Sequence, residues 1–233
     1  MKIQIFKNKR KSLLLSNRIR SYLLYAIGEI ILVVLGILIA LYISNWNENN
    51  RVKERSYSSL KRIKTDLITE AYVLKDFKKR YRYSKEYLKN ILYSENKNQL
   101  DSIRFHFGPF VHYKMNTEYS NLKSSGQLNL IFNNDLRYNI VNFYEVYYAV
   151  YSELEKEHKT FINSKVLNYF YEQFPSDTSN FIKSELVKNK LNDDEFKSII
   201  NYQISSLKYI TDNLFLDLIE NLIKEIDSEL VEN

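Results

Sequence analysis

Glutamate and histidine side chains three residues apart come nearest, in this sequence, to a catalytic or metal-binding motif. Glu155 and His158 form one Glu-x-x-His pair. On a helix this spacing places both side chains on one face, as in the di-iron sites of helical bundles. Those sites need a second such pair and two further glutamates, whereas here a single pair lies beside Glu153 and Glu157. A solvated acidic helix face is the better interpretation, and we expect no metal or other cofactor.

The other two histidines, His106 and His112, flank a Gly-Pro bend at residues 108–109. No third ligand lies near them in the sequence, so we interpret both as surface or packing residues. The chain contains no cysteine, which excludes thiolate chemistry, disulfides and cysteine-based zinc sites. Because no nucleophile motif or phosphate loop is visible either, the sequence favours a protein that is not an enzyme.

Two further segments have a possible binding role and a plainer alternative. Residues 122–126, Leu-Lys-Ser-Ser-Gly, could expose backbone amides in a turn. We favour the end of a short helix with Thr117 as its N-cap, because Gly126 can adopt the left-handed conformation of a helix C-terminus. Four tyrosines could line a groove, although core and interface aromatics need no ligand. They are Tyr144, Tyr147, Tyr148 and Tyr151.

An apolar run at residues 22–43 is the strongest structural signal in the chain. It has 22 residues and one charge, Glu29. A helix of this length measures about 33 Å, which matches a hydrocarbon core of roughly 30 Å. We predict a transmembrane helix in a lipid bilayer, between a basic tail at residues 1–21 and a helical domain at residues 44–233. A cleaved signal peptide is less favoured, because residues 42–44 do not form a small-x-small cleavage site. The predicted interfacial anchors are Tyr22, Tyr25, Tyr42 and Trp46.

One face of the predicted transmembrane helix is suited to a neighbouring helix. Glu29 lies about 10 Å into the hydrocarbon, where an ionisable group needs a partner, protonation or a route to the headgroups. Glu29, Gly36 and Ala40 fall within a stripe about 40° wide, and Gly36 and Ala40 form a small-x-x-x-small packing pattern. The stripe indicates a contact with a second copy or another membrane protein. Snorkelling of Glu29 and a proton-coupled role like that of stator subunits are the alternatives.

The charge distribution argues against nucleic acid and suggests an orientation. The net charge is +6, and the basic tail alone contributes +7, so the domain after the span is neutral and lacks the electrostatic footprint of a nucleic-acid binder. The positive-inside rule favours a cytoplasmic N-terminus and a periplasmic domain. Residues 51–90 carry +8 and residues 91–233 carry −7, so we expect the first helix to lie against acidic later helices, within the domain or in an oligomer. A basic cluster on that helix comprises Lys78, Lys79, Arg80 and Arg82, interleaved with Tyr81 and Tyr83.

The domain is predicted to consist of long helices, because 4 glycines and 2 prolines are few for 233 residues. The first helix continues from the span, with a joint at the asparagine-rich residues 45–50. Loops are expected at residues 94–99 and 175–180. A second helix begins at Asn134 or Asp135 and ends before Pro175, a weaker one covers residues 181–190, and the last begins at Asn192 or Asp193 and continues to Leu230. The predicted fold is all-α, with one N-terminal transmembrane helix continuing into an elongated antiparallel helical bundle.

Two segments resemble those of flavobacterial-type single-pass membrane proteins from Bacteroidota, a family of unknown function. They are YAIGEIILVVLGILIALYISNWNE at residues 25–48 and TEYSNLKSSGQLNLI at residues 117–131. The resemblance covers nearly the whole chain and implies a bacterial envelope setting, but it assigns no catalytic residue. We therefore predict an inner-membrane scaffold, assembly or accessory subunit that acts through protein contacts, either as a homo-oligomer or with another membrane protein. The alternatives are a periplasmic ligand sensor and a stator-like subunit that uses Glu29.

Overall fold

The structure, a computed structural model, describes residues 3–94, 99–174 and 181–232, and within these ranges the side chains of residues 20–231. The described residues form helices and connecting segments, and they contain no strand. The loop predicted at residues 94–99 is described only at its two ends, and the turn predicted at 175–180 lies outside the described residues. The all-helical prediction is confirmed for the described part of the chain.

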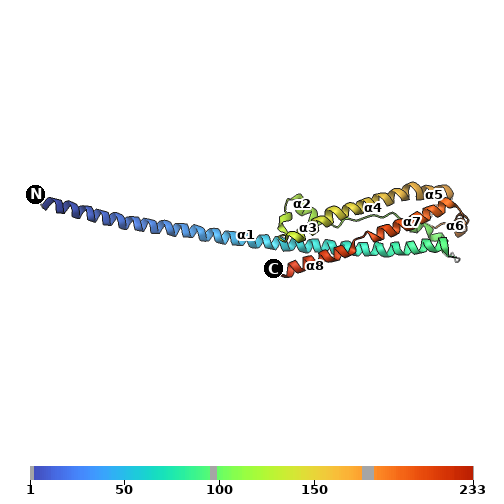
Figure 1. The fold of residues 1–233 in the computed structure, drawn as a ribbon, viewed down its shortest axis with the longest axis horizontal. Coiled ribbons are helices and arrows are strands. Elements are labelled where there is room, and N and C mark those ends of the chain that lie inside the picture. The colour runs from blue at the N-terminus through green and yellow to red at the C-terminus, as the bar shows by residue number, and fades with distance from the viewer. Residues whose placement is uncertain (1–2, 95–98, 175–180, 233) are drawn as a thin grey trace. The chain divides into compact units, whose positions relative to one another are not determined.

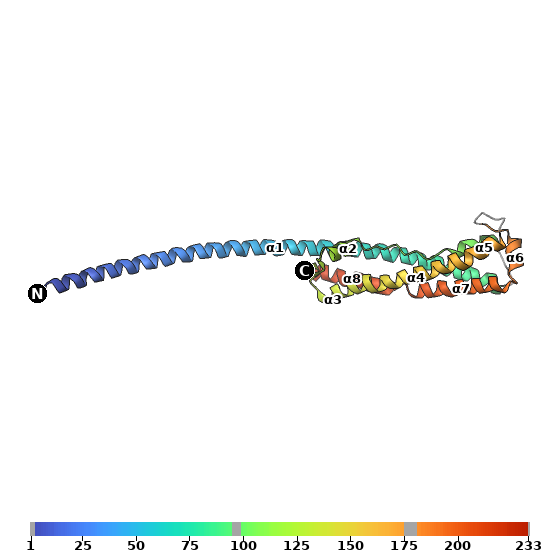
Figure 2. The ribbon, with the colours of Figure 1, turned by 90° about the horizontal axis from the view of Figure 1, so that it is seen from above.

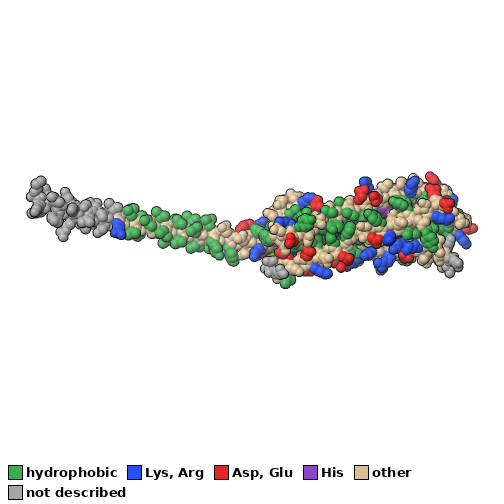
Figure 3. Space-filling model, viewed as in Figure 1, with side chains coloured by type: hydrophobic (Ala, Val, Ile, Leu, Met, Phe, Trp, Pro, Cys, Tyr) green, Lys and Arg blue, Asp and Glu red, His purple; other side chains and the backbone are tan. Residues whose placement is uncertain are grey.

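The chain divides into two compact units, Met1–Arg55 and Ser56–Asn233, and the long helix α1 (Ile3–Tyr93) contributes to both. In the first unit, large apolar side chains of residues 22–43 are between 46% and 76% exposed, and Figure 3 shows hydrophobic side chains along this stretch. Among the described residues, α1 is the one helix long and apolar enough to cross a membrane. The predicted joint at residues 45–50 is wrong, because these residues are helical. The helical cost of each asparagine, about 0.7 kcal/mol at most, is too small to break a long helix.

In the second unit, α1 buries the face that its apolar spacing predicts. The nine predicted core residues are all buried: Leu60, Ile63, Leu67, Ala71, Leu74, Phe77, Tyr81, Leu88 and Ile91. Apart from Ala71, these residues follow a heptad pattern of alternating three- and four-residue steps. The pattern contains two polar residues, Glu70 and Ser84. Both become important in the site described below.

The elements after α1 begin close to the predicted positions. In chain order they are η1 (Leu100–Phe107), α2 (Thr117–Ser124), η2 (Leu128–Leu130), α3 (Asn134–Asn142), η3 (Phe143–Tyr147), α4 (Tyr148–Phe161), η4 (Ile162–Val166), α5 (Leu167–Gln173), α6 (Ser184–Lys190), α7 (Asp194–Asp212) and α8 (Leu216–Glu232). The side chain of Asn133 caps α3 by accepting hydrogen bonds from the backbone nitrogens of Asp135 and Leu136. Asp193 caps α7 in the same way. The weaker helix predicted at 181–190 is the shorter α6.

The last predicted helix is divided into α7 and α8. Phe215 has a φ of 47°, in the left-handed region that a helix does not use, and the chain turns there. The buried hydroxyl of Tyr151 on α4 donates to the carbonyl oxygen of Leu214 at 2.6 Å. A partner from a distant helix therefore satisfies a carbonyl group freed by the break, which the local apolar spacing could not reveal.

Within the second unit, α1 and α4 run in the same direction (Figures 1 and 2). Glu70 of α1 contacts Tyr148 at the start of α4, and Tyr81, further along α1, lies against His158, further along α4. The helices α1 and α4 are therefore parallel, and not antiparallel as expected. The chain runs back from the end of α1 to the start of α4 through a largely extended segment, so no long helix lies between them in the sequence.

The chain then returns through α7 and α8, which run opposite to α1 and α4. On α1, Lys64 pairs with Asp227 at 2.5 Å and Lys75 pairs with Glu220 at 2.7 Å, both on α8. On α4, His158 contacts Gln203 and Phe161 packs against Tyr202, both on α7. Residue numbers rise along one helix as they fall along the other in each pair, so these neighbours are antiparallel.

Candidate functional site

An extended segment at residues 108–116, which we call the strap, joins η1 to α2 without forming a helix. Gly108 and Pro109 begin it, and proline disfavours a helical conformation at the residue before it. Phe110 and His112 are buried. Backbone N–H groups of a buried extended segment have no helical partner and must find acceptors elsewhere. The polar side chains around the strap supply them.

Glu155 and His158 bind the backbone of the strap. The N–H of Phe110 donates to Nδ1 of His158 at 2.9 Å, and the N–H of His112 donates to Oε2 of Glu155 at 3.3 Å. His158 is only 3% exposed. The prediction of a solvated acidic face is therefore wrong for His158 and incomplete for Glu155, which is half-buried, although Glu153 and Glu157 are exposed as expected. The Glu-x-x-His spacing here places two acceptors against one extended segment.

His158 is held in a single tautomer. Its Nδ1 accepts from Phe110, so its Nε2 carries the proton and donates to Oε1 of Gln203 at 2.9 Å. The Nε2 of Gln203 donates in turn to the carbonyl oxygen of His106, also at 2.9 Å. Burial lowers the pKa of His158, while the hydrogen bond with Gln203 acts in the opposite direction. The side chain is therefore a neutral structural link between the strap and α7.

The centre of the site is a buried pair between Glu70 of α1 and His112 of the strap. Nε2 of His112 lies 2.5 Å from Oε1 of Glu70, and their side chains are 2% and 1% exposed. Oε2 of Glu70 accepts from the hydroxyl of Tyr148 at 2.9 Å and from the N–H of Met115 at 3.2 Å. Burial, and then the charge of Glu70, raises the pKa of Tyr148, which keeps its phenol protonated as a donor. Within the described part of the chain, Nδ1 of His112 has no hydrogen-bond partner.

Ser84, the second polar residue in the heptad pattern of α1, meets the other histidine. Nδ1 of His106 lies 3.0 Å from its hydroxyl, and burial lowers the pKa of His106 to about 4. His106 and His112 are therefore packing residues, which is one of the two roles predicted for them.

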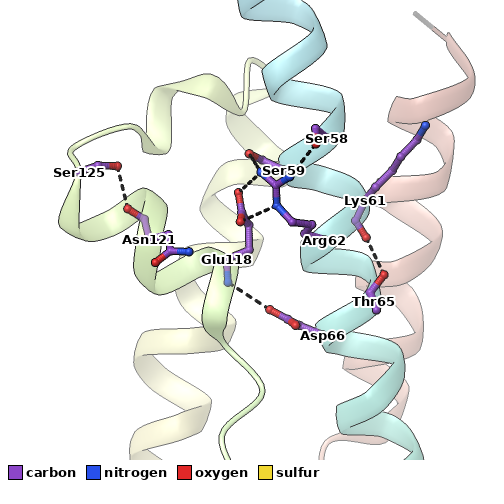
Figure 4. A network of polar contacts seen from close by, with 9 residues as sticks. All are labelled: Ser58, Ser59, Lys61, Arg62, Thr65, Asp66, Glu118, Asn121 and Ser125. Carbon is purple, nitrogen blue, oxygen red and sulfur yellow. Dashed lines mark hydrogen bonds and ion pairs between the residues drawn. The ribbon is translucent and has the colours of Figure 1, made fainter.

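The end of the strap is attached to α1 by an ion pair (Figure 4). The guanidinium of Arg62 donates from Nε and Nη2 to the two carboxylate oxygens of Glu118, at 2.7 and 2.9 Å. The N–H of Glu118 donates to Asp66 at 3.3 Å. Hydrogen bonds from Arg62 are the main cause that holds the pKa of the Glu118 carboxyl below its usual value. This bidentate pair fixes the first turn of α2 on α1.

The Leu-Lys-Ser-Ser-Gly segment is the end of α2, as predicted. Gly126 has a φ of 68°. The N–H of Gln127 donates to the carbonyl of Leu122 at 2.8 Å, and that of Gly126 donates to Lys123 at 3.2 Å, which is the Schellman pattern of a helix C-terminus. Thr117, by contrast, is the first residue of α2 and Asn116 is the N-cap, with no side-chain hydrogen bond.

The four tyrosines predicted as a groove or a core belong to the core. Tyr144, Tyr148 and Tyr151 are buried, and Tyr147 is half-buried. The hydroxyl of Tyr144 has no partner among the described residues, and the ring stacks on Tyr119 of α2 with centroids 4.5 Å apart. Their aromatic surface therefore joins α4 to the strap and to α2.

The predicted basic cluster is only partly compensated by later helices. Lys64 and Lys75 pair with α8 as described above, but Arg80 pairs with Asp76 on its own helix at 2.9 Å. Lys79 and Arg82 are exposed and form no ion pair with the part of the chain that the structure describes. The expected pairing with acidic residues of later helices is therefore found for Lys64 and Lys75, which precede the basic cluster. It is not found for the cluster itself among the described residues.

The residues predicted to face a neighbour in the membrane lie in the first unit. Glu29, Gly36 and Ala40 are exposed on α1, and no atom lies within 4 Å of a Cβ added at Gly36. The predicted interfacial anchors, Tyr22, Tyr25, Tyr42 and Trp46, are exposed as well. Their roles in a membrane remain predictions.

Sequence reasoning missed Arg62, Asp66, Glu70, Glu118 and Gln203. A signal for Glu70 was present, because this glutamate occupies a heptad position between Leu67 and Leu74. Within the described residues, no group of three or more histidine, aspartate or glutamate side chains has the geometry of a metal site. The arrangement can fix the strap against α1, α4 and α7.

Comparison with known proteins gives one match. The family of unknown function DUF6090 matches residues 29–173, a range that begins at Glu29 and includes the strap and its partners on α1 and α4. No curated protein and no solved structure matches the chain. Because the match covers more than half of the sequence, the chain belongs to the DUF6090 family.

Proposed function

We propose that this protein is a single-pass protein of the bacterial inner membrane that acts through protein contacts, as a scaffold, assembly factor or accessory subunit. The observation that carries the proposal is the uncovered apolar surface of α1 at residues 22–43, none of which packs on the described chain. A large apolar surface of this kind must be covered by lipid or by another protein. The helix is long enough for lipid to cover it.

A stripe on this surface favours a helix neighbour in addition to lipid. Small side chains at Gly36 and Ala40 allow two helix backbones to approach closely, and Glu29 on the same stripe can form a hydrogen bond across the contact. We propose a second copy of the chain as the neighbour. The basic tail supports a cytoplasmic N-terminus, with the helical unit in the periplasm as an elongated bundle.

The family match supports a joint role for the span and the helical unit. The match begins inside the apolar stretch and ends in α5. Most of the apolar stretch and a large part of the helical unit therefore belong to one family model. The polar contacts of the strap give the helical unit a fixed internal arrangement. A helical unit with a fixed internal arrangement, joined to a transmembrane helix that self-associates, is suited to presenting the same surface to a partner protein.

The self-association can be tested with two matched glycine variants. Gly36 and Gly28 both have open space around an added Cβ, but Gly28 lies about 80° around the helix from Gly36 and off the stripe. Two differently tagged full-length copies should co-purify from membranes. Gly36→Leu should reduce the recovered partner by about tenfold, and Gly28→Leu should leave it unchanged. Equal recovery with Gly36→Leu would exclude this face as the contact.

A further inference from the structure

A cleft lies between the second half of α1, the end of η1 and α7. Its volume is about 510 Å³, within the range typical of small-molecule sites. The wall formed by α1 includes Lys79, Arg80 and Tyr83, and the opposite wall includes Phe105 and His106. His106 and its partner Ser84 belong to the contacts around the strap, whereas the side chains of Lys79, Arg80, Tyr83 and Phe105 form no hydrogen bond to the strap among the described residues. The cleft therefore needs an explanation of its own.

Aromatic rings form one part of the cleft. Tyr83 is 63% exposed and Phe105 is 52% exposed, and both line the cleft. The rings of Tyr83 and His106 lie 5.7 Å apart. His106 is fixed from behind, because it stacks on Tyr87 at 3.8 Å and contacts Ser84. His106 itself is buried, with 8% exposure, so the exposed aromatic surface of the cleft is supplied by Tyr83 and Phe105.

Uncompensated positive charge forms the other part. A second depression of about 540 Å³ shares Lys79 and Tyr83 with the cleft, and Lys78, Arg82 and Glu86 also line it. Glu86 already pairs with Lys85 and Lys89. Lys78, Lys79 and Arg82 lie within two turns of α1, and none forms an ion pair with the described residues. Like charges at this spacing repel one another. A bound anion would remove that repulsion.

We propose that this cleft binds a small ligand that joins a planar ring to phosphate groups, with the ring against Tyr83 and Phe105 and the phosphates at Lys79 and Arg82. Aromatic side chains stack on planar rings. The guanidinium fork of an arginine matches phosphate oxygens, and a lysine adds a point charge. Arg80 contributes less charge, because Asp76 already pairs with it. The proposal adds a ligand site to a protein whose proposed function needs none.

The experiment uses calorimetric titration of the full-length protein in detergent micelles with three probes. ATP carries both a ring and phosphates, adenosine carries only the ring, and tripolyphosphate carries only the charge. We expect ATP to bind about tenfold more tightly than either fragment, since stacking of one base contributes about 1–3 kcal/mol. Tyr83→Ser should weaken ATP binding by about tenfold and leave tripolyphosphate binding unchanged.

A matched pair of double variants tests the charged part. Lys79→Gln with Arg82→Gln should weaken ATP binding by about tenfold or more. Lys61→Gln with Lys114→Gln removes the same charge from exposed positions away from the cleft and should have little effect. Circular dichroism confirms that each variant is folded. Equal weakening by both double variants would reduce the effect to net charge and overturn the proposal.

Three other results would also overturn it. The first is tripolyphosphate binding as tightly as ATP, which would leave only a charged patch. The second is tighter binding of a single-stranded RNA of about 12 nucleotides than of ATP, which would make the cleft a nucleic-acid site. The third is the absence of any heat with ATP up to about 1 mM. None of these results bears on self-association through the span, so the two proposals can fail separately.

Discussion

Residues 22–43 and residues 60–91 belong to one helix, yet the chain itself covers only the second stretch. In the first, apolar side chains surround the helix and are exposed. In the second, they follow a heptad pattern that is buried, and two polar residues interrupt it. Glu70 and Ser84 each meet a histidine from the segment around the strap. A uniformly apolar stretch therefore needs a covering that the described residues do not supply, whereas polar residues inside an apolar stripe indicate where another segment of the chain packs.

The largest effect is expected at the buried pair. Glu70→Ala removes the acceptor of His112, Tyr148 and the backbone of Met115 at once, and should destabilise the helical unit by about 3–5 kcal/mol. Urea unfolding of the full-length protein in detergent, followed by circular dichroism, measures the change. Glu153→Ala on the exposed face of α4 is the control. A loss under about 1 kcal/mol would show that the polar interruption has no structural role.

Two leucine variants compare the two stretches directly. Leu67 is fully buried, and Leu67→Ala should cost about 2–5 kcal/mol through lost burial and a residual cavity. Leu35 is 52% exposed in the first stretch, and Leu35→Ala should shift the unfolding of the helical unit by no more than about 0.5 kcal/mol. The same urea titration serves for both variants. Similar losses at the two positions would contradict the distinction between the stretches.

The ion pair at the end of the strap should give a smaller, pH-dependent effect. Glu118→Ala should destabilise the helical unit by about 2 kcal/mol at neutral pH, since hydrogen bonds to charged groups contribute about 1.5–3 kcal/mol. The pKa of Glu118 is lowered in the folded state, so its contribution is present above the unfolded pKa, near 4.3, and is lost as pH falls through the folded value. Wild type and variant should therefore converge in stability at low pH. A constant difference down to about pH 2 would exclude the ion pair as its source.

His106 provides the smallest effect at neutral pH, and its test is confined to a narrow pH range. Burial lowers its pKa from 6.5 to about 4, so the unfolded chain takes up a proton there before the folded one does. Stability should fall as pH drops from about 6.5 to about 4, by up to about 3 kcal/mol, and the contribution should level off below that range. Comparing the urea midpoints of wild type and His106→Gln across this range measures it. An identical pH dependence in the two proteins would mean that His106 is not buried as described.

Local patterns predicted the helical core of this chain residue by residue. The nine core positions of α1 and the cap at Asp193 depend on neighbours within a few residues, where spacing and capping chemistry act. Strap contacts depend on partners 42 to 48 residues away, such as Glu70 with His112 and His158 with Phe110. No periodicity reports such distances. For that reason Glu155 and His158 looked like a fragment of a metal motif or a solvated face.

The break at Phe215 escaped prediction for a related reason. Apolar residues continue through it at helical spacing, and the turn is stabilised by Tyr151 from another helix. A glycine would have indicated such a turn, whereas a phenylalanine with positive φ is held there by its surroundings. The heptad position of Glu70 was the one visible sign of the site. Reading polar residues inside an apolar stripe as signs of a distant partner would have located it.

The pairing of Lys64 with Asp227, 163 residues further along the chain, also bears on the order of events during synthesis. When the ribosome has finished α1, it has not yet made α8, which contacts α1 at Lys64 and Lys75. The part of α1 that contacts α8 must therefore wait for residues 216–232 before its contacts are complete, and such long-range contacts slow folding.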